Sequence, residues 1–126
     1  LFLHGGICRA MKSRTQLATP DDDTERCILW SDPGARPGEL PNLRGAGTLF
    51  GEDVTDEVFS GLGVKALIRS HEPRKARKGV VVEHNGKVVT TSTTTVYRGK
   101  PFILILDPQQ FPSTAQEFKD VTYLLK

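Results

Sequence analysis

Residues 1–6 read LFLHGG and residues 67–72 read LIRSHE, and the fold predicted from the sequence rests on these two stretches. Each is an apolar run that stops at a histidine: His4 precedes two glycines, and His71 precedes Glu72 and Pro73. Apolar runs that end abruptly at turn-forming residues are typical of buried strands. We therefore expect a histidine at the end of each of two strands.

Helices are predicted between these strands. Asp53 opens a helix with acidic residues in its first turn and Gly61 and Gly63 at its end, and its apolar side is expected to pack on a sheet. Residues 8–25 are polar and predict a loop in which one aspartate of the run 21–23 caps a short helix reaching Trp30. The acidic run itself is interpreted as a solvated face rather than a metal site.

The stretch from residue 31 to residue 51 is rich in proline and glycine and predicts an irregular segment. Long irregular loops in compact domains often have a function.

The second half of the chain is rich in strand signals. Residues 80–83 and 87–93 flank His84, Asn85 and Gly86, and Asn-Gly between such runs predicts a hairpin with His84 as a turn neighbour. Residues 102–107 predict a further strand, and residues 118–125 a last strand with a helix as the alternative. The expected fold class is α+β, mixed and strand-rich.

Length and composition set limits on the protein class. The chain has 126 residues and 13.9 kDa, which allows one domain at most. Its longest apolar run, Phe102–Leu106, is far shorter than the ~20 residues that a membrane helix needs. With no charged-then-apolar leader, the expected location is cytoplasmic or nuclear, with no membrane contact. The chain opens on an apolar run without methionine, so we expect a segment of a longer protein.

Net charge and cysteine content limit the kinds of partner and of cross-link that the sequence predicts. Lys and Arg number 17 against 15 Asp and Glu, and this net charge of +2 argues against nucleic acid as a partner. The basic cluster within residues 74–78 is interpreted as a solvated face, with the binding of a phosphorylated partner or of nucleic acid as the alternative. Cys8 and Cys27 are expected to be reduced, small core residues, because a chain of this size needs no disulfide.

Three side chains are candidates for chemistry. Imidazole nitrogen is a good ligand for zinc, iron and manganese, so His4 and His71 at strand ends are candidate metal ligands, with a structural role as the alternative. Two histidines cannot hold a metal pair without further ligands. Arg44, within NLRGAG, is a candidate for forked recognition of a phosphate or carboxylate, against the alternative of a solvated loop arginine.

Ordered blocks of sequence then indicate a family. In chain order these blocks are LFLHGG, ILWSDP, LRGAGTLFGEDVT, LIRSHE and TTSTTTVY. They resemble the C-terminal half of the catalytic domain of the phosphoprotein phosphatase family of Ser/Thr protein phosphatases, within the calcineurin-like metallophosphoesterase superfamily. The resemblance implies that residues 1–126 form the C-terminal part of a two-sheet sandwich with flanking helices, a partial catalytic domain.

The resemblance also implies roles for single residues. His4 and His71 match the two histidines that bind one ion of a dinuclear metal centre, and Arg44 matches an arginine that binds the substrate phosphate. The catalytic cleft of the family is lined by residues that match Trp30, Asp32 and Tyr97.

The implied function is the metal-dependent hydrolysis of phosphoserine and phosphothreonine on proteins. It implies two metal ions (Mn, Fe or Zn) that this chain binds only in part, a phosphoprotein substrate, and a regulatory subunit or domain. The family motifs GDxHG, GDxVDRG and GNHE, which supply the other metal ligands and the acid, do not occur in the 126 residues. We therefore expect the chain alone to be inactive.

Two other functions are open. Residues 93–96 depart from the family pattern and the following loop is short, which favours a degenerate, non-catalytic interaction module. A metallophosphoesterase acting on a dinucleotide polyphosphate would share the histidines and the arginine.

Overall fold

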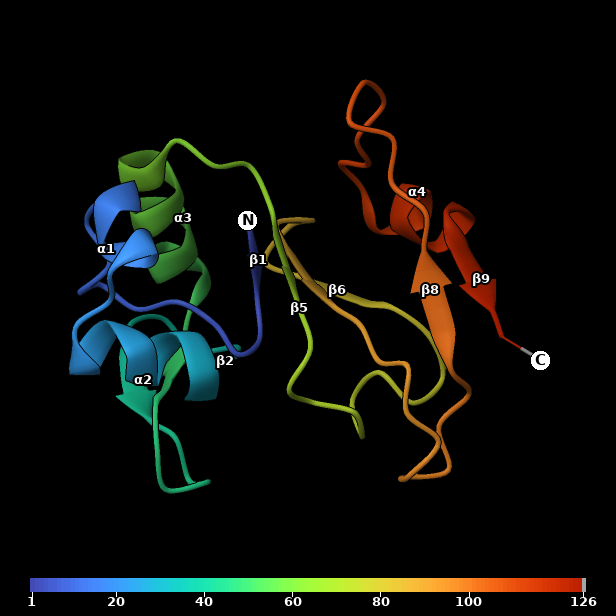
Figure 1. Ribbon diagram of the computed structural model, residues 1–126, viewed down its shortest axis with the longest axis horizontal. Helices are drawn as coiled ribbons and strands as arrows, with labels where there is room; N and C mark the ends of the chain where they lie inside the picture. The colour runs from blue at the N-terminus through green and yellow to red at the C-terminus, as the bar shows by residue number, and fades with distance from the viewer. Residues whose placement is uncertain (126) are drawn as a thin grey trace.

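Four strands form the central sheet, in the order β1-β5-β7-β6 (Figure 1). The computed structural model describes residues 1–125, and the sheet consists of β1 (Phe2–Leu3), β5 (Leu67–Arg69), β7 (Val88–Thr90) and β6 (Val81–Glu83). β1 is parallel to β5 and β5 to β7, whereas β6 pairs antiparallel with β7. The expected strands around LFLHGG and LIRSHE are therefore neighbours in one sheet.

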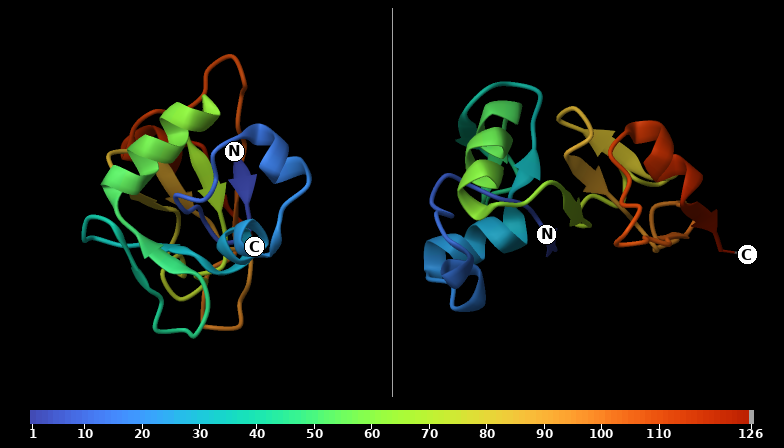
Figure 2. Two further views of the ribbon diagram at one scale, coloured as in Figure 1. Left: turned by 90° about the vertical axis from the view of Figure 1, so that its left-hand side faces the viewer. Right: turned by 90° about the horizontal axis from the view of Figure 1, so that it is seen from above.

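Each face of this sheet covers its own hydrophobic core. Side chains alternate between the faces of a strand, so Leu67 and Val88 pack in one core while Ile68 and Val89 pack in the other. Figures 1 and 2 show helices α1 (Arg14–Ala18), α2 (Asp22–Trp30) and α3 (Glu52–Leu62) on one side of the sheet, and α4 (Ala115–Asp120) on the other. Burial on both faces explains why β5 and β7 each begin with two apolar residues.

Helix α3 packs on the sheet as expected, with small differences at its ends. Its buried side chains recur at helical spacing and belong to the first core: Val54, Val58, Phe59 and Leu62. The N-cap is Gly51 rather than Asp53, which lies in the first turn. Gly63 ends the helix in the left-handed conformation, at φ 63°, that glycine adopts without steric cost.

Helix α2 begins at the aspartate run, as expected. The Asp21 carboxylate accepts a hydrogen bond from the Thr24 backbone N–H at 2.8 Å, so the acidic residues cap the helix. The short helix α1 lies within the segment expected to be a loop. Ser13 and Gln16 form a capping box there, a local signal that the sequence interpretation missed.

The prediction that residues 31–51 are irregular was wrong. They contain a second sheet in the order β2-β4-β3, formed by β2 (Asp32–Pro33), β4 (Thr48–Phe50) and β3 (Glu39–Pro41). Strands this short leave room for proline at their ends and glycine in the turns between them. The proline and glycine content therefore predicted the turns correctly but not the short strands between them.

The hairpin around residues 84–86 was predicted correctly. His84 and Asn85 have φ values of 50° and 53°, which allow a tight turn between β6 and β7. His84 is a structural residue: its Nδ1 lies 2.8 Å from Thr55 Oγ1 and its Nε2 lies 3.0 Å from the Gly34 carbonyl oxygen.

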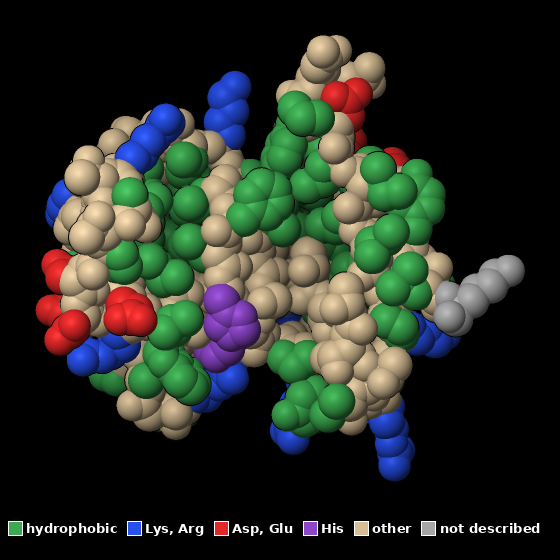
Figure 3. All heavy atoms as spheres, viewed as in Figure 1, with side chains coloured by type: hydrophobic (Ala, Val, Ile, Leu, Met, Phe, Trp, Pro, Cys, Tyr) green, Lys and Arg blue, Asp and Glu red, His purple; other side chains and the backbone are tan. Residues whose placement is uncertain are grey.

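The C-terminal residues contain both elements that the sequence left open. Helix α4 begins with a capping box formed by Thr114 and Glu117, and β9 (Thr122–Leu124) pairs antiparallel with β8 (Phe102–Leu104). Phe102 and Phe118 are fully buried in the second core. Figure 3 shows hydrophobic side chains over β8 and β9, and Ile105 and Leu124 remain 57% and 61% exposed.

Cys8 and Cys27 form a disulfide, contrary to the expectation of free thiols. Both are buried, as expected for core residues. The bond joins the turn after His4 to α2, where the Gly5 N–H also donates to the Ile28 carbonyl at 2.6 Å. A Cβ atom on Gly5 would lie 2.6 Å from the Leu29 backbone, so only glycine permits this approach. Cysteine spacing alone does not reveal that the fold brings the two Cα atoms within 5.9 Å.

The longest described helix, α3, has 11 residues, and no helix in residues 1–125 is long and apolar enough to cross a membrane.

Candidate functional site

The two histidines lie side by side at one edge of the central sheet. Leu3 pairs with Arg69 in the parallel register of β1 and β5, so the residues that follow these strands meet at the same edge. The Ser70 N–H donates to the His4 carbonyl at 3.1 Å, and the rings of His4 and His71 are 5.1 Å apart between centroids. Strand ends 67 residues apart thus bring both imidazoles to one place.

Asp32, the first residue of β2, connects the site. Its side chain is only 3% exposed. Its Oδ1 lies 2.9 Å from His71 Nδ1, and its Oδ2 lies 3.3 Å from Arg44 Nη1. The Asn42 side-chain amide also donates to Oδ2 at 2.8 Å. One buried carboxylate therefore orients both the predicted metal ligand His71 and the predicted phosphate ligand Arg44.

Arg69 completes this arrangement, and sequence reasoning missed it. Its guanidinium is fully buried and contacts Asp32 at 2.5 Å and Glu72 at 2.6 Å. It also donates to the Gly5 carbonyl and, at 3.2 Å, to Thr90 Oγ1. The guanidinium thereby joins the C-terminal ends of β1, β5 and β7. The available signal was a charged residue at the end of an otherwise apolar strand.

The electrostatics of the site keep Asp32 ionised. Burial acts to raise the pKa of its carboxyl, but the hydrogen bond from Asn42 and the positive charge of Arg69 outweigh burial, and the pKa lies below its usual value. Burial lowers the pKa of His4, and the neighbouring His71, Arg69 and Arg44 lower it further. The lower pKa favours the neutral ring, which keeps a nitrogen lone pair.

His71 is held in an unusual conformation. Its φ of 70° lies in the left-handed region, which a non-glycine residue adopts only where its surroundings enforce it. Its Nδ1 is bonded to Asp32, so Nε2 is the nitrogen left for a ligand. Trp30, a predicted cleft residue, is 43% exposed and meets the His71 ring edge-on at 5.6 Å.

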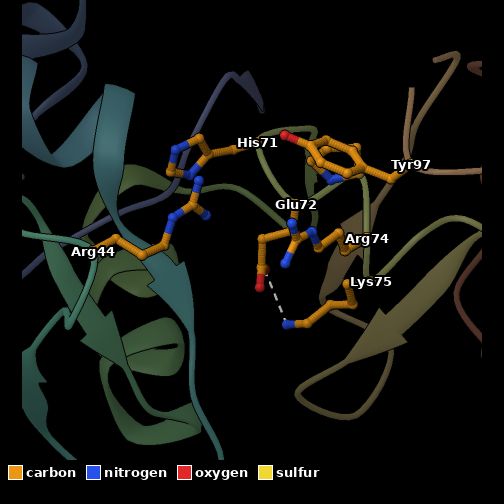
Figure 4. A pocket seen from close by; sticks show the side chains of 7 residues that line it. Arg44, His71, Glu72, Arg74, Lys75 and Tyr97 are labelled. Carbon is orange, nitrogen blue, oxygen red and sulfur yellow. Dashed lines mark ion pairs between the residues drawn. The ribbon is translucent and has the colours of Figure 1, made fainter. Parts of the chain in front are cut away.

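Arg44, His71 and Tyr97 line one cavity of about 380 Å³ (Figure 4). Figure 4 shows Arg44 directed toward His71 and Tyr97 on the opposite side, with Glu72, Arg74 and Lys75 between them. The Arg74 guanidinium carbon lies 4.9 Å from the centre of the Tyr97 ring. We call this the phosphate cavity, because its polar groups are those predicted to surround a phosphate.

The positive groups of the phosphate cavity differ in how available they are to an anion. Arg44 is 46% exposed and has only Nη1 bound to Asp32. Lys75, by contrast, is paired with Glu72 and Glu83, each at 3.0 Å. His4 lines an adjacent cavity of about 330 Å³ together with His71 and residues 91–94. Both cavities are thus lined by His71 and Pro73.

The histidines fit a metal ion only in part. No group of three or more metal-binding side chains occurs in residues 1–125. Ser70 Oγ lies 3.2 Å from His4 Nδ1, and the Asp32 carboxylate lies against His71 Nδ1, so each ring could present Nε2 to an ion. The structure thus brings together His4, His71, Asp32, Arg44 and Tyr97, while their roles in chemistry stay predictions.

Comparisons with known proteins extend the resemblance. No protein-family model matches the chain. It is 35% identical over 107 residues to serine/threonine-protein phosphatase T of Aspergillus oryzae, and 33% identical over 103 residues to serine/threonine-protein phosphatase 5 of Arabidopsis thaliana. It is also 48% identical over 71 residues to serine/threonine-protein phosphatase with EF-hands 1 of Mus musculus. These matches cover 77%, 75% and 56% of the chain, respectively.

A solved structure agrees in fold. A protein serine/threonine phosphatase from Saccharomyces cerevisiae, with similarity to human phosphatase PP5, aligns with a TM-score of 0.64 and 29% identity over 76% of this chain. The chain spans 32% of that structure, and 22%, 19% and 11% of the Aspergillus, Arabidopsis and mouse relatives. The mixed α+β architecture is therefore that of part of a phosphatase catalytic domain.

Proposed function

Because the chain belongs to the phosphoprotein phosphatase family, we propose that it supplies the phosphate-binding side of a catalytic centre that hydrolyses phosphoserine and phosphothreonine on proteins. One observation supports this most directly: the buried Asp32 carboxylate contacts His71 and Arg44, which line one cavity with Tyr97. The cavity therefore presents the positively charged hydrogen-bond donors that a phosphate monoester requires.

Arg44 would bind the phosphoryl oxygens. One nitrogen of its guanidinium is oriented by Asp32, and the others are open to the cavity for a forked contact. Negative charge on these oxygens would be stabilised throughout the reaction, and such a contact is worth roughly 3 kcal/mol in comparable sites. Tyr97 would border the bound phosphate from the loop after β7.

His4 and His71 would each offer Nε2 to one metal ion of the implied pair. Bound ions would supply a hydroxide nucleophile near neutral pH and polarise the phosphate. Asp32, 2.9 Å from His71 Nδ1, would orient the ring and favour the tautomer that leaves Nε2 free for the ion. The lowered pKa of His4 keeps its lone pair free for a ligand.

This chain alone should show no turnover, since the 126 residues contain two of the expected metal ligands and none of the family's carboxylate motifs. A phosphothreonine peptide assayed with Mn²⁺ tests this expectation. Turnover close to that of a complete relative would contradict it.

A chimera tests the positive half of the proposal. Residues 1–126 replace the matched segment of the Saccharomyces phosphatase, and hydrolysis of a phosphothreonine peptide is measured with added Mn²⁺. We expect activity that is lost on His71→Ala and reduced about a hundredfold on Arg44→Ala, the loss of one strong electrostatic contact. Arg36→Ala, which removes another exposed arginine, serves as the control and should leave the rate unchanged.

A folded but inactive chimera would favour the non-catalytic interaction module, provided that the phosphothreonine peptide still binds. Hydrolysis of a dinucleotide polyphosphate in preference to the peptide would favour the third function. Either result would overturn the proposed one.

We also propose a cytoplasmic or nuclear location for the parent protein, together with a regulatory subunit or domain. The Cys8–Cys27 disulfide is an observation against that location, since such bonds persist mainly in oxidising compartments. Thiol alkylation in intact cells, followed by mass spectrometry of the peptides containing Cys8 and Cys27, tests it. Alkylated thiols are expected, and a protected disulfide would contradict the proposed location.

A further inference from the structure

A second cavity, of about 440 Å³, is lined by four residues that are all positively charged: Arg77, Lys78, Arg98 and Lys100. We call it the basic pocket. Its residues come from the turn after His71 and from the loop after Tyr97, the same two segments that line one side of the phosphate cavity. The sequence interpretation treated the first of these segments as a solvated face.

The basic pocket is built by backbone contacts between the two segments. The Lys100 N–H donates to the Arg77 carbonyl at 2.9 Å, and the Arg98 N–H donates to the Thr95 carbonyl at 2.9 Å. Arg98 has a φ of 58°, an uncommon conformation for a non-glycine residue. A Cβ atom on Gly99 would lie 2.7 Å from the Thr94 carbonyl oxygen, so the loop passes here as closely as glycine allows. The four cations are therefore held together by the fold.

The charges of the basic pocket are not compensated by acidic side chains. None of the four residues forms an ion pair within residues 1–125, whereas Arg9 pairs with Asp53 at 2.8 Å and with Glu57 at 2.7 Å. Four like charges around one cavity repel one another and create a positive local potential. An anion would relieve this repulsion.

The basic pocket and the phosphate cavity are lined by neighbouring residues of the same two segments. Arg74 packs on Tyr97 in the phosphate cavity, and Arg77 follows three residues later, after a turn closed by the Ala76 N–H bonded to the Glu72 carbonyl at 3.1 Å. Tyr97 and Arg98 are adjacent in the other segment. The basic pocket is therefore next to the phosphate cavity along both segments, and it is the neighbouring site for residues that flank a phosphorylated residue bound at Arg44.

We propose that the basic pocket binds a second anionic side chain of the substrate polypeptide, so that the preferred substrates are acidic or multiply phosphorylated segments. This rests on the proposed function for its first contact, at Arg44. The anion is either a second phosphorylated residue or a carboxylate. A polypeptide is favoured over a nucleic acid because no aromatic side chain lines the basic pocket to stack a base, and the net charge is only +2.

The test measures binding of fluorescent peptides to the complete 126-residue chain by anisotropy, at two salt concentrations. One peptide carries a single phosphothreonine in a neutral sequence. Others add a second phosphothreonine or a glutamate at spacings of about two to six residues, which sample the separation of the sites at roughly 3.3 Å per residue. A peptide with the acidic residues but no phosphate, and a single-stranded RNA, complete the set.

Two matched variants separate the pocket from general charge. Arg77→Gln combined with Lys78→Gln removes two charges from the basic pocket, and Arg36→Gln combined with Lys65→Gln removes the same two residue types from exposed positions outside it. Circular dichroism of both variants confirms that they fold. Arg44→Ala removes the proposed first contact.

We expect the second anion to tighten binding about five- to tenfold at one spacing, as for a pair of charge-assisted contacts. This advantage should disappear in the pocket variant, persist in the control variant and fall at high salt. Equal affinities for all phosphopeptides would overturn the proposal. Loss of the advantage in both double variants, or tighter binding of the RNA than of any peptide, would also overturn it.

Failure of the proposed function gives a different result. If Arg44→Ala leaves the affinity for the singly phosphorylated peptide unchanged, the function assigned to the phosphate cavity is wrong. The basic pocket then stands only if the non-phosphorylated acidic peptide still binds and loses affinity in the pocket variant.

Discussion

Asp32 and the three side chains paired with it, Arg44, Arg69 and His71, form a charged cluster that differs from the basic pocket in how its charges are compensated. In the cluster, Asp32 and Arg69 are almost completely buried, and each polar atom has a close partner. In the basic pocket, four cations are exposed and lack acidic partners within residues 1–125. Buried charge must be paired to be tolerated, so it is suited to fixing geometry. Exposed unpaired charge stays available to a ligand.

The largest effect is expected when the buried cluster is broken. Asp32→Ala removes one of the two carboxylates paired with the buried Arg69 guanidinium and also leaves the Asn42 amide without its acceptor, and we expect a loss of about 3–5 kcal/mol in the free energy of unfolding. Urea unfolding followed by circular dichroism measures it. Asp22→Ala removes an exposed aspartate as the control. A loss for Asp32→Ala as small as that of the control would show that the buried pair does not hold the strand ends.

Removing the disulfide should have the next largest effect. Cys8 and Cys27 are 19 residues apart, and cross-linking a loop of that size stabilises a chain by about 3 kcal/mol in the loop-entropy model. The double variant Cys8→Ser and Cys27→Ser should unfold at a lower urea concentration than the oxidised wild type. Treating the wild type with dithiothreitol should produce the same shift, and the variant itself should not respond. A wild-type midpoint insensitive to dithiothreitol would contradict this expectation.

Substitution of Arg44 should affect peptide binding far more than the stability of the fold. Its guanidinium is 46% exposed, so Arg44→Ala should change the free energy of unfolding by no more than about 0.5 kcal/mol. Affinity for the phosphothreonine peptide should nevertheless fall by roughly tenfold or more, because a charged hydrogen-bond donor to phosphate is lost. Calorimetric titration beside urea unfolding measures both quantities. A large stability loss with unchanged affinity would make Arg44 a structural residue.

The exposed, paired charges of Arg9, Asp53 and Glu57 should give the smallest effect. The hydrogen bond from the Gly38 N–H, helped by Arg9, lowers the pKa of Asp53, and hydrogen bonds from Arg9 and Lys12 lower the pKa of Glu57. A carboxyl whose pKa is lower when folded stabilises the fold above its unfolded pKa and loses this contribution as pH falls through the folded value.

Unfolding midpoints measured from pH 7 to pH 3 therefore test the contribution of these exposed ion pairs. The wild type should lose slightly more stability below about pH 4.5 than Arg9→Ala, and the difference should shrink at high salt. Identical acid profiles of the two proteins would show that this surface network contributes nothing.

Much of the local structure could be predicted from the sequence because its causes are local. Residues only a few positions apart determine the apolar side of α3, its end at Gly63 and the turn at residues 84–86. The strands of residues 31–51 escaped prediction because strands of two or three residues carry little periodic signal and obtain their partners from elsewhere.

The side chains available for chemistry could be read from the sequence: two histidines at strand ends and an arginine in a glycine-rich loop, in the order typical of a phosphatase. How these side chains meet depends on the three-dimensional fold. The parallel register of β1 and β5 placed His4 beside His71, and Asp32 from another sheet linked His71 to Arg44. The roles of Arg69 and the basic pocket also emerged only there, because burial and the pairing of charges depend on distances in space between residues far apart in the chain.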